Sequence, residues 1–247
     1  MIILPILFFI TAILYSSVGF GGGSTYLALL LLWDVPFFLL PVIALGCNII
    51  VVSGNSFNYI KAGNLNIKLL IPYLIGSIPM AFLGGSLEIE KIFFEILLFF
   101  VLIISGSLLL FNFKSYDDNT FKSNKINKLL SIFIGGTIGL VSGIVGIGGG
   151  IFLSPILFLL KASLPKYIVT ASSLFILINS IAGILGQLTK FNVLNNVLEY
   201  WYLLFLVFIG GQIGNFLNLK VLPTRFLALI TSCLVIFVAV RMGLKLI

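Results

Sequence analysis

Two clusters of adjacent glycines contain the residues of this chain that could do chemistry. The first reads Gly19-Phe20-Gly21-Gly22-Gly23 and the second reads Gly146-Ile147-Gly148-Gly149-Gly150, and both lie in long apolar runs. Each interior glycine destabilises a helix by about 1 kcal/mol relative to alanine, so a triplet favours a break in the helix. A helix that restarts after such a break presents unpaired N–H groups and the positive end of its dipole, and these together bind anions.

Polar side chains on two other segments could complete such a site. Asn48, Asn55 and Tyr59 recur at i, i+7 and i+11, which places them on one face of a helix. A second polar face contains Ser173, Ser180 and Gln187, with Ser172 and Asn179 alongside. Buried amides and hydroxyls in a membrane must face partners or a cavity. The alternative is hydrogen bonding between helices, worth about 0.6 kcal/mol per contact.

These patterns predict a site for a small anion, with no catalytic or metal-ligating residues. The candidate ligands come from both glycine clusters, from the hydroxyls that follow the first cluster, and from the two polar faces. They are Gly21, Gly22, Gly23, Ser24, Thr25, Asn48, Gly148, Gly149, Gly150, Ser172 and Ser173.

Close helix packing is the competing interpretation of the glycines. Gly135, Gly139 and Gly143 recur every four residues, a spacing that lets two helices approach closely. We favour packing for Gly135 and Gly139. We favour the anion site for the two triplets, because packing needs spaced glycines and not adjacent ones.

The composition is that of an integral membrane protein. Of the 247 residues, 60% are hydrophobic and 9% are charged, and the mean hydropathy is +1.26. These values exclude a soluble globular domain, and a membrane span needs about 20 apolar residues. We expect an all-α protein with eight apolar segments: Ile2–Trp33, Pro36–Ile60, Ile67–Leu87, Ile92–Phe113, Ile126–Leu160, Tyr167–Thr189, Val197–Leu219 and Leu222–Leu246.

The segments form two repeats within one membrane domain. The first and fifth are too long for one straight span, and each is interrupted by its glycine cluster. Residues 1–113 form the first repeat, 114–125 a polar linker and 126–247 the second repeat. The glycines of the first cluster match those of the second at a constant shift of 127, which also relates Ala44 to Ala171. After an insertion of seven residues the shift becomes 134 and relates Gly76 to Gly210.

The topology of the repeats depends on whether the broken segments cross the bilayer. If all eight segments cross, the repeats are parallel and the 14 Lys and Arg residues divide nine to five between the faces. If the first and fifth enter and return, the repeats are inverted and the division is ten to four. Cytoplasmic loops carry the excess of Lys and Arg, which favours inverted repeats with the 114–125 linker in the cytoplasm.

Several functional classes are excluded by missing residues. The chain contains no His, so an intramembrane Ser protease would lack its base and a zinc protease its HExxH ligands. Neither glycine cluster continues into a G-x-G-x-x-G, and a dinucleotide site would also need a soluble βαβ unit. The net charge of +7 lies in loops, where it reflects orientation and anionic lipid and not nucleic acid. We expect no enzyme activity and no cofactor.

The second glycine cluster and the residues after it carry a family resemblance. The stretch from Gly146 to Leu157 resembles the G-x-G-G-G-x4-P-x-L motif of the TauE/SafE sulfite exporter family, also called the toluene sulfonate uptake permease family. In the first copy Ala28 stands where the second has Pro155. The resemblance covers nearly the whole chain and implies a membrane transporter of small anions, often sulfur oxyanions or sulfonates.

Our sequence-based interpretation is therefore a multi-pass carrier for a small anion in the inner membrane of a prokaryotic cell. A channel, or a non-catalytic subunit of a larger membrane complex, is the alternative.

Overall fold

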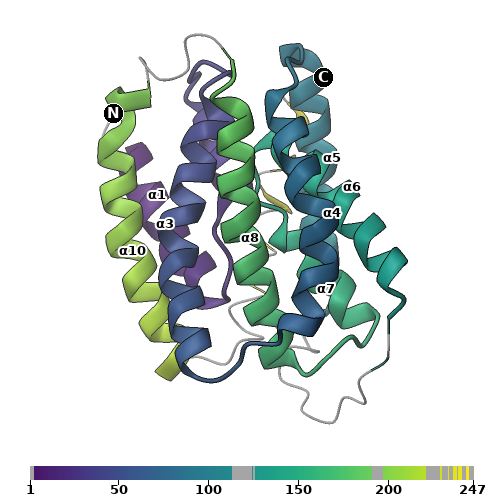
Figure 1. Ribbon diagram of the computed structural model, residues 1–247. Coiled ribbons are helices and arrows are strands. Elements are labelled where there is room, and N and C mark those ends of the chain that lie inside the picture. Colours follow the sequence, from purple (N-terminus) through teal and green to yellow (C-terminus); the bar gives the residue numbers. More distant parts are fainter. Residues whose placement is uncertain are drawn as a thin grey trace.

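The computed structural model describes residues 3–112, 124, 126–190 and 197–220, together with positions 229, 233, 236, 237, 239, 240, 243 and 244. All regular structure in these residues is helical (Figure 1). The elements are α1 (Ile3–Ser17), α2 (Gly23–Leu32), α3 (Leu40–Lys61), α4 (Ile67–Ser86), α5 (Lys91–Asn112), α6 (Lys128–Val145), α7 (Gly150–Leu159), α8 (Pro165–Gln187), η2 (Leu198–Tyr200) and α10 (Trp201–Lys220).

Five stretches of the described residues are long and apolar enough to cross a membrane. They are helices α3, α4, α6 and α8, and the stretch Leu198–Leu217. Helices α1, α2 and α7 are shorter. The helices follow the predicted apolar segments closely. Most of the predicted eighth segment lies outside the described residues, as does the 114–125 linker except for Asn124.

Both predicted helix breaks are present. Helix α1 ends at Ser17 and α2 begins at Gly23, while α6 ends at Val145 and α7 begins at Gly150. Gly19 and Gly22 have φ of 83° and 90°, and their counterparts Gly146 and Gly149, 127 residues later, have φ of 89° and 79°. Only glycine adopts this left-handed conformation without a steric penalty, so the shared spacing produces two similar breaks. They differ at Gly148, which has φ of 84°, while its counterpart Gly21 does not have positive φ.

The turn after each short helix repeats as well. Asp34 and Lys161 are also 127 residues apart, and they are the only non-glycine residues with positive φ among those described, at 53° and 49°. The hydrogen bond from Val35 N to Leu30 O (3.1 Å) recurs from Ala162 N to Leu157 O (2.9 Å). The shift of 127 therefore holds in backbone conformation beyond the glycines.

Helices α4 and α6 pack through glycines. A Cβ on Gly135 would overlap the backbone of Tyr73, and one on Gly139 would lie 2.5 Å from Ser77 O. Residue numbers rise together along the two helices, so α4 and α6 are parallel. The predicted packing role of Gly135 and Gly139 is confirmed. The pair α1 and α10 is built in the same way, since Gly210 lies against Phe9 and Gly214 against Ile13.

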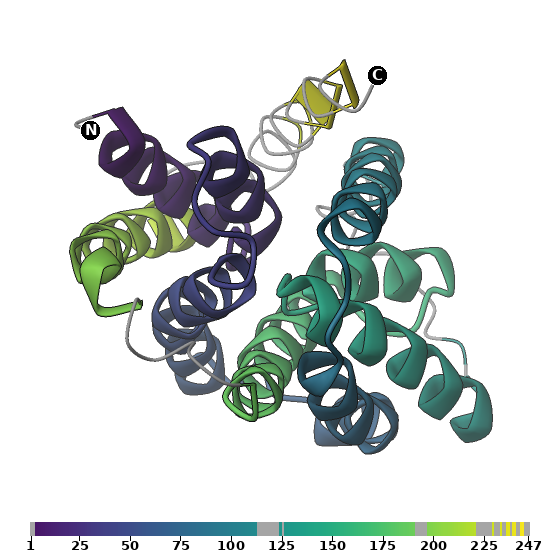
Figure 2. The ribbon, with the colours of Figure 1, turned by 90° about the horizontal axis from the view of Figure 1, so that it is seen from above.

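Helices α3 and α8 cross the middle of the molecule in opposite directions. Leu45 lies near Gly183, whereas Ser56 Oγ lies 3.0 Å from Ser173 Oγ, so the numbering rises along one helix as it falls along the other. Seen from above, α1, α3 and α10 gather on one side of α8, and α4, α5 and α6 gather on the other (Figure 2).

The turns fall at two ends of this bundle. At one end, Asn124 N donates to Lys161 O (2.9 Å), and Asn124 lines a pocket with Lys68 and Lys128. We call this the lysine end. At the other end, Asp34 lines a hollow with Lys91. Lys91 is the first residue of α5 and follows the C-terminal end of α4, whereas Lys68 lies at the N-terminal end of α4. Asp34 and Lys161, which occupy equivalent positions in the two repeats, therefore lie at opposite ends of the bundle.

Candidate functional site between the glycine loops

The two glycine loops meet in the middle of the molecule, at Asn48 of α3. Asn48 is completely buried, and its Nδ2 donates a 2.8 Å hydrogen bond to the carbonyl oxygen of Ile147 in the second loop. A Cβ on Gly23 of the first loop would lie 2.8 Å from that same oxygen, and one on Gly148 would lie 2.9 Å from Asn48 Nδ2. This approach is therefore possible only because these positions lack side chains.

The helices that begin at these loops have uncapped N-termini. Asn66 and Asn127 cap α4 and α6, accepting hydrogen bonds from Leu69 N and Leu129 N. Helices α2 and α7 start instead at left-handed Gly22 and Gly149 and have no side-chain cap. Because the first N–H groups of a helix have no partner within it, both termini retain donors and positive potential in the interior. This geometry is suited to binding an anion.

The hydroxyls predicted to help at the first loop are held by a residue that we did not predict. Tyr15 OH lies 2.8 Å from Thr25 Oγ1 and 3.1 Å from Ser24 Oγ, and all three side chains are buried. Tyr15 is the last aromatic residue of α1 before the break and its ring turns back over the start of α2. Only the fold brings it there, and the sequence offers no pattern that would have identified it.

The space between the loops is small. It measures about 10 Å³ and is lined by uncharged residues only: Tyr15, Phe20, Gly21, Gly22, Gly23, Ser24, Ile147, Ile151 and Ile176. A cavity of about 10–15 Å³ holds a single water molecule. An oxyanion is larger, so the loops must separate before one can bind between them.

Several buried polar atoms around the loops lack hydrogen-bond partners within the described residues. They are Asn48 Oδ1, Ser142 Oγ, Ser172 Oγ, Asn179 Oδ1 and Ser180 Oγ. Buried polar atoms in proteins are nearly always paired, with protein, water or ligand. These five atoms are therefore available to hydrogen-bond with water or with a polar ligand. Ser142 was not among the predicted residues, and Ser180 was noted only as part of a polar face.

The predicted glycines differ in what they face. Gly21 and Gly23 face Asn48, and Gly148 faces both Asn48 and Ser180. Gly150 packs against α8, where a Cβ would lie 2.8 Å from Ser172 O. Gly22 instead faces Tyr26 and Thr11, while Gly149 faces Ile138 and Phe175. These last two glycines shape the loops through their positive φ and do not face the opposite loop.

Ser173 belongs to a second polar group, nearer the lysine end. Its hydroxyl lies 3.0 Å from Ser56 Oγ, and the residue before Ser56 on α3, Asn55, accepts through Oδ1 a 2.9 Å hydrogen bond from Ser16 Oγ. The structure thus gives Ser173 a partner on α3. The backbone carbonyl oxygen of Ser172, the adjacent residue, lies close to Gly150 of the second loop.

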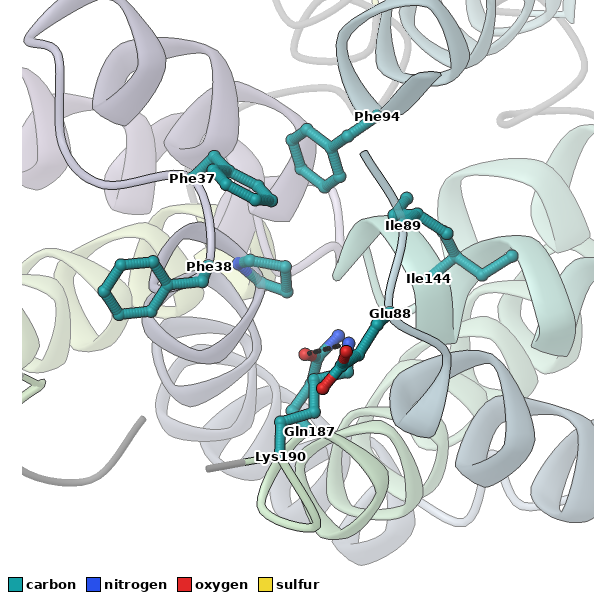
Figure 3. A pocket seen from close by; sticks show the side chains of 9 residues that line it. Phe37, Phe38, Glu88, Ile89, Phe94, Ile144, Gln187 and Lys190 are labelled. Carbon is teal, nitrogen blue, oxygen red and sulfur yellow. Dashed lines mark hydrogen bonds between the residues drawn. The ribbon is translucent and has the colours of Figure 1, made fainter. Parts of the chain in front are cut away.

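Larger pockets lie toward the two ends of the molecule. The one at the lysine end has a volume of about 390 Å³ and includes Asn66, Lys68, Tyr73, Asn124 and Lys128 in its lining. The one at the opposite end has a volume of about 230 Å³ and lies among Phe37, Phe94, Glu88, Gln187 and Lys190 (Figure 3). The narrow centre therefore lies between two larger hollows.

Comparison with known proteins identifies the family. A family model described as Sulfite exporter TauE/SafE matches residues 4–242. The chain belongs to the TauE/SafE family. The resemblance carried by the motif from Gly146 to Leu157 is thus confirmed, and this TauE/SafE chain is a multi-pass membrane transporter.

Two relatives are similar over most of their length. A probable membrane transporter protein of Sinorhizobium fredii is 29% identical over 232 residues, which cover 94% of this chain and 93% of the relative. A probable membrane transporter protein of Methanocaldococcus jannaschii is 32% identical over 201 residues, covering 76% and 74%. No solved structure matches the chain.

Proposed function

We propose that this transporter is a secondary carrier for a small anion, either a sulfur oxyanion such as sulfite or an organosulfonate. The observation that carries the proposal is the meeting of two uncapped helix N-termini, those of α2 and α7, around Asn48. The anion would bind where the loops now touch. Backbone N–H groups, the Asn48 amide and nearby hydroxyls such as Ser172 would hold it.

A neutral site of this kind suits an anion in the membrane interior. A lysine or arginine at the centre of a transmembrane helix costs about 2.5–3.5 kcal/mol on insertion scales. Each helix N-terminus supplies the equivalent of about half a positive charge without that cost. Such moderate coordination also allows release, which a carrier requires as much as binding.

We further propose that the two repeats are inverted. Three observations support this arrangement: α3 and α8 are antiparallel, the turns at Asp34 and Lys161 lie at opposite ends, and the α1–α10 contact mirrors the α6–α4 contact. In inverted repeats the broken segments enter the membrane and return, which brings both glycine loops to the midplane.

The lysine end is proposed to face the cytoplasm of a prokaryotic cell, with the protein in its inner membrane. More lysines lie in turns or at helix ends on that side than on the other. Those on the lysine end are Lys61, Lys68, Lys128, Lys161 and Lys166, and those on the other end are Lys91 and Lys190. Cytoplasmic loops of membrane proteins carry such an excess of lysine.

The narrow centre between two larger hollows favours a carrier over a channel. A channel needs a continuous path, whereas an alternating carrier passes through states in which the site is closed to both sides. Rocking of one repeat against the other would open the loops to each hollow in turn. The Asn48–Ile147 hydrogen bond joins the two repeats at the point where they must part.

Transport by the purified protein in proteoliposomes tests this function. Uptake of labelled sulfite, sulfate and benzenesulfonate is measured against concentration, with and without the same unlabelled anion inside. A carrier gives saturating uptake that internal anion accelerates. Flux that neither saturates nor responds to internal anion would indicate a channel, and absence of flux for all three anions would reject the proposed substrate class.

A further inference from the structure

The pocket at the end opposite the lysine end has two chemically distinct sides. Phe37 and Phe94 form an aromatic side, while Glu88, Gln187 and Lys190 gather on the other (Figure 3). All these residues lie in turns or at helix ends, outside the narrow space between the glycine loops.

Lys190 is held in place by a neutral side chain, and the nearest acidic residue in its pocket is Glu88. Its Nζ donates a 3.0 Å hydrogen bond to Gln187 Oε1, and an ammonium group has three protons to donate. Glu88 lines the same pocket but forms no ion pair with Lys190. Burial lowers the pKa of Lys190, and the Glu88 carboxylate opposes this shift. A half-buried ammonium with free donors gains more from an anionic ligand than a fully solvated one does.

We infer that this pocket is a second binding site, for an organic monoanion whose acid group binds Lys190 and whose apolar body lies against Phe37 and Phe94. The volume of about 230 Å³ is below the range of about 300–1,000 Å³ typical of sites for drug-sized ligands. The ligand is therefore small, with one aromatic ring or a short aliphatic chain.

The pocket is also connected to the second glycine loop. Gln187, which holds Lys190, donates through Nε2 a 3.0 Å hydrogen bond to Gly143 O near the end of α6. Pro41 lines the pocket, and a Cβ on Gly146 would overlap it. A ligand in the pocket would therefore contact residues that touch the end of α6 and the start of the second glycine loop. The site shares no lining residue with the space between the loops, so the effect of a Lys190 variant on binding distinguishes it from the proposed site there.

Calorimetric titration of the full chain in lipid nanodiscs tests the inference. The probe is benzenesulfonate, and benzenesulfonamide serves as its uncharged analogue. Wild type binds the sulfonate, and K190Q weakens this binding by about tenfold, the loss of one hydrogen bond between charged groups. K190R retains most of the affinity. E88Q strengthens it by about two- to fivefold, because a competing surface charge is removed.

Lys91 provides the matched control. It lies at the same end of the bundle and is ion-paired with Glu95 at 3.8 Å, so K91Q should leave the affinity unchanged. Equal affinities for wild type and K190Q would overturn the inference, as would absence of sulfonate binding to wild type. Equal affinity for the sulfonamide and the sulfonate would also overturn it. Unchanged melting temperatures of the variants verify that the fold is intact.

Discussion

Asn48 and Ile147 connect the two repeats at the centre of the molecule. The side-chain amide of Asn48, on α3 of the first repeat, donates to the carbonyl oxygen of Ile147 in the glycine loop of the second (2.8 Å). The other amide atom, Oδ1, has no partner and lies beside Gly21 and Gly23. One side chain thus reaches both loops, at the place where we propose that the anion binds.

Substitution of Asn48 should impair transport, and a negatively charged replacement should impair it more than a neutral one. N48A removes one hydrogen bond to the anion and should weaken apparent affinity by about tenfold. N48D keeps the shape but adds a negative charge, and like charges about 4 Å apart repel by about 4 kcal/mol at an effective dielectric constant of about 20. We therefore expect N48D to abolish uptake.

Initial rates of anion uptake at matched protein abundance measure both effects. S53A, on the exposed side of the same helix, should transport like wild type. Normal uptake by N48D would show that no anion passes close to this side chain.

Two adjacent glycines of α6 should respond oppositely to alanine. A Cβ on Gly135 would overlap the backbone of Tyr73, whereas on Gly136 the nearest atom would be 3.6 Å away. G135A must separate α4 from α6 and should destabilise the protein by about 1–3 kcal/mol. G136A should be neutral or stabilise it by up to about 1 kcal/mol, through helix propensity. Thermal unfolding in detergent compares the two, and equal melting temperatures would contradict the packing described here.

Labelling of single cysteines tests the inverted arrangement. Asp34 and Lys161 occupy equivalent turns of the two repeats. In a chain without Cys47 and Cys233, D34C should react with an impermeant maleimide from outside the cell, and K161C should react only after the membrane is opened. Reaction of both cysteines from the same side would support parallel repeats instead.

The elements and their breaks could be predicted from the sequence because they follow from local physics. Apolar run length determined the helices, and adjacent glycines marked both breaks, since left-handed φ is a property of single residues. The shift of 127 recurs in the structure at Asp34 and Lys161.

The contacts that build the site could not be predicted in this way, because they join elements far apart in the chain. The hydrogen bonds of Tyr15 to Ser24 and Thr25 depend on how α2 folds back on α1. Ser172 and Ser173 looked equivalent in sequence, yet the Ser173 hydroxyl pairs with Ser56, whereas the Ser172 hydroxyl has no partner among the described residues. Likewise, only the folded loops show that Gly22 and Gly149 face Tyr26 and Phe175 and not the opposite loop.

Uptake of labelled anion by G23A most directly tests the claim that the anion binds between the glycine loops. A Cβ on Gly23 would lie 2.5 Å from Asn48 Nδ2 and 2.8 Å from Ile147 O, whereas one on Gly46 of α3 would have its nearest neighbour at 3.5 Å. The added methyl group occupies the contact between the loops and has no flexible neighbour to displace on the Ile147 side. G23A should therefore insert normally and lose transport, while G46A keeps it. Wild-type uptake by G23A at wild-type abundance would contradict the proposed site.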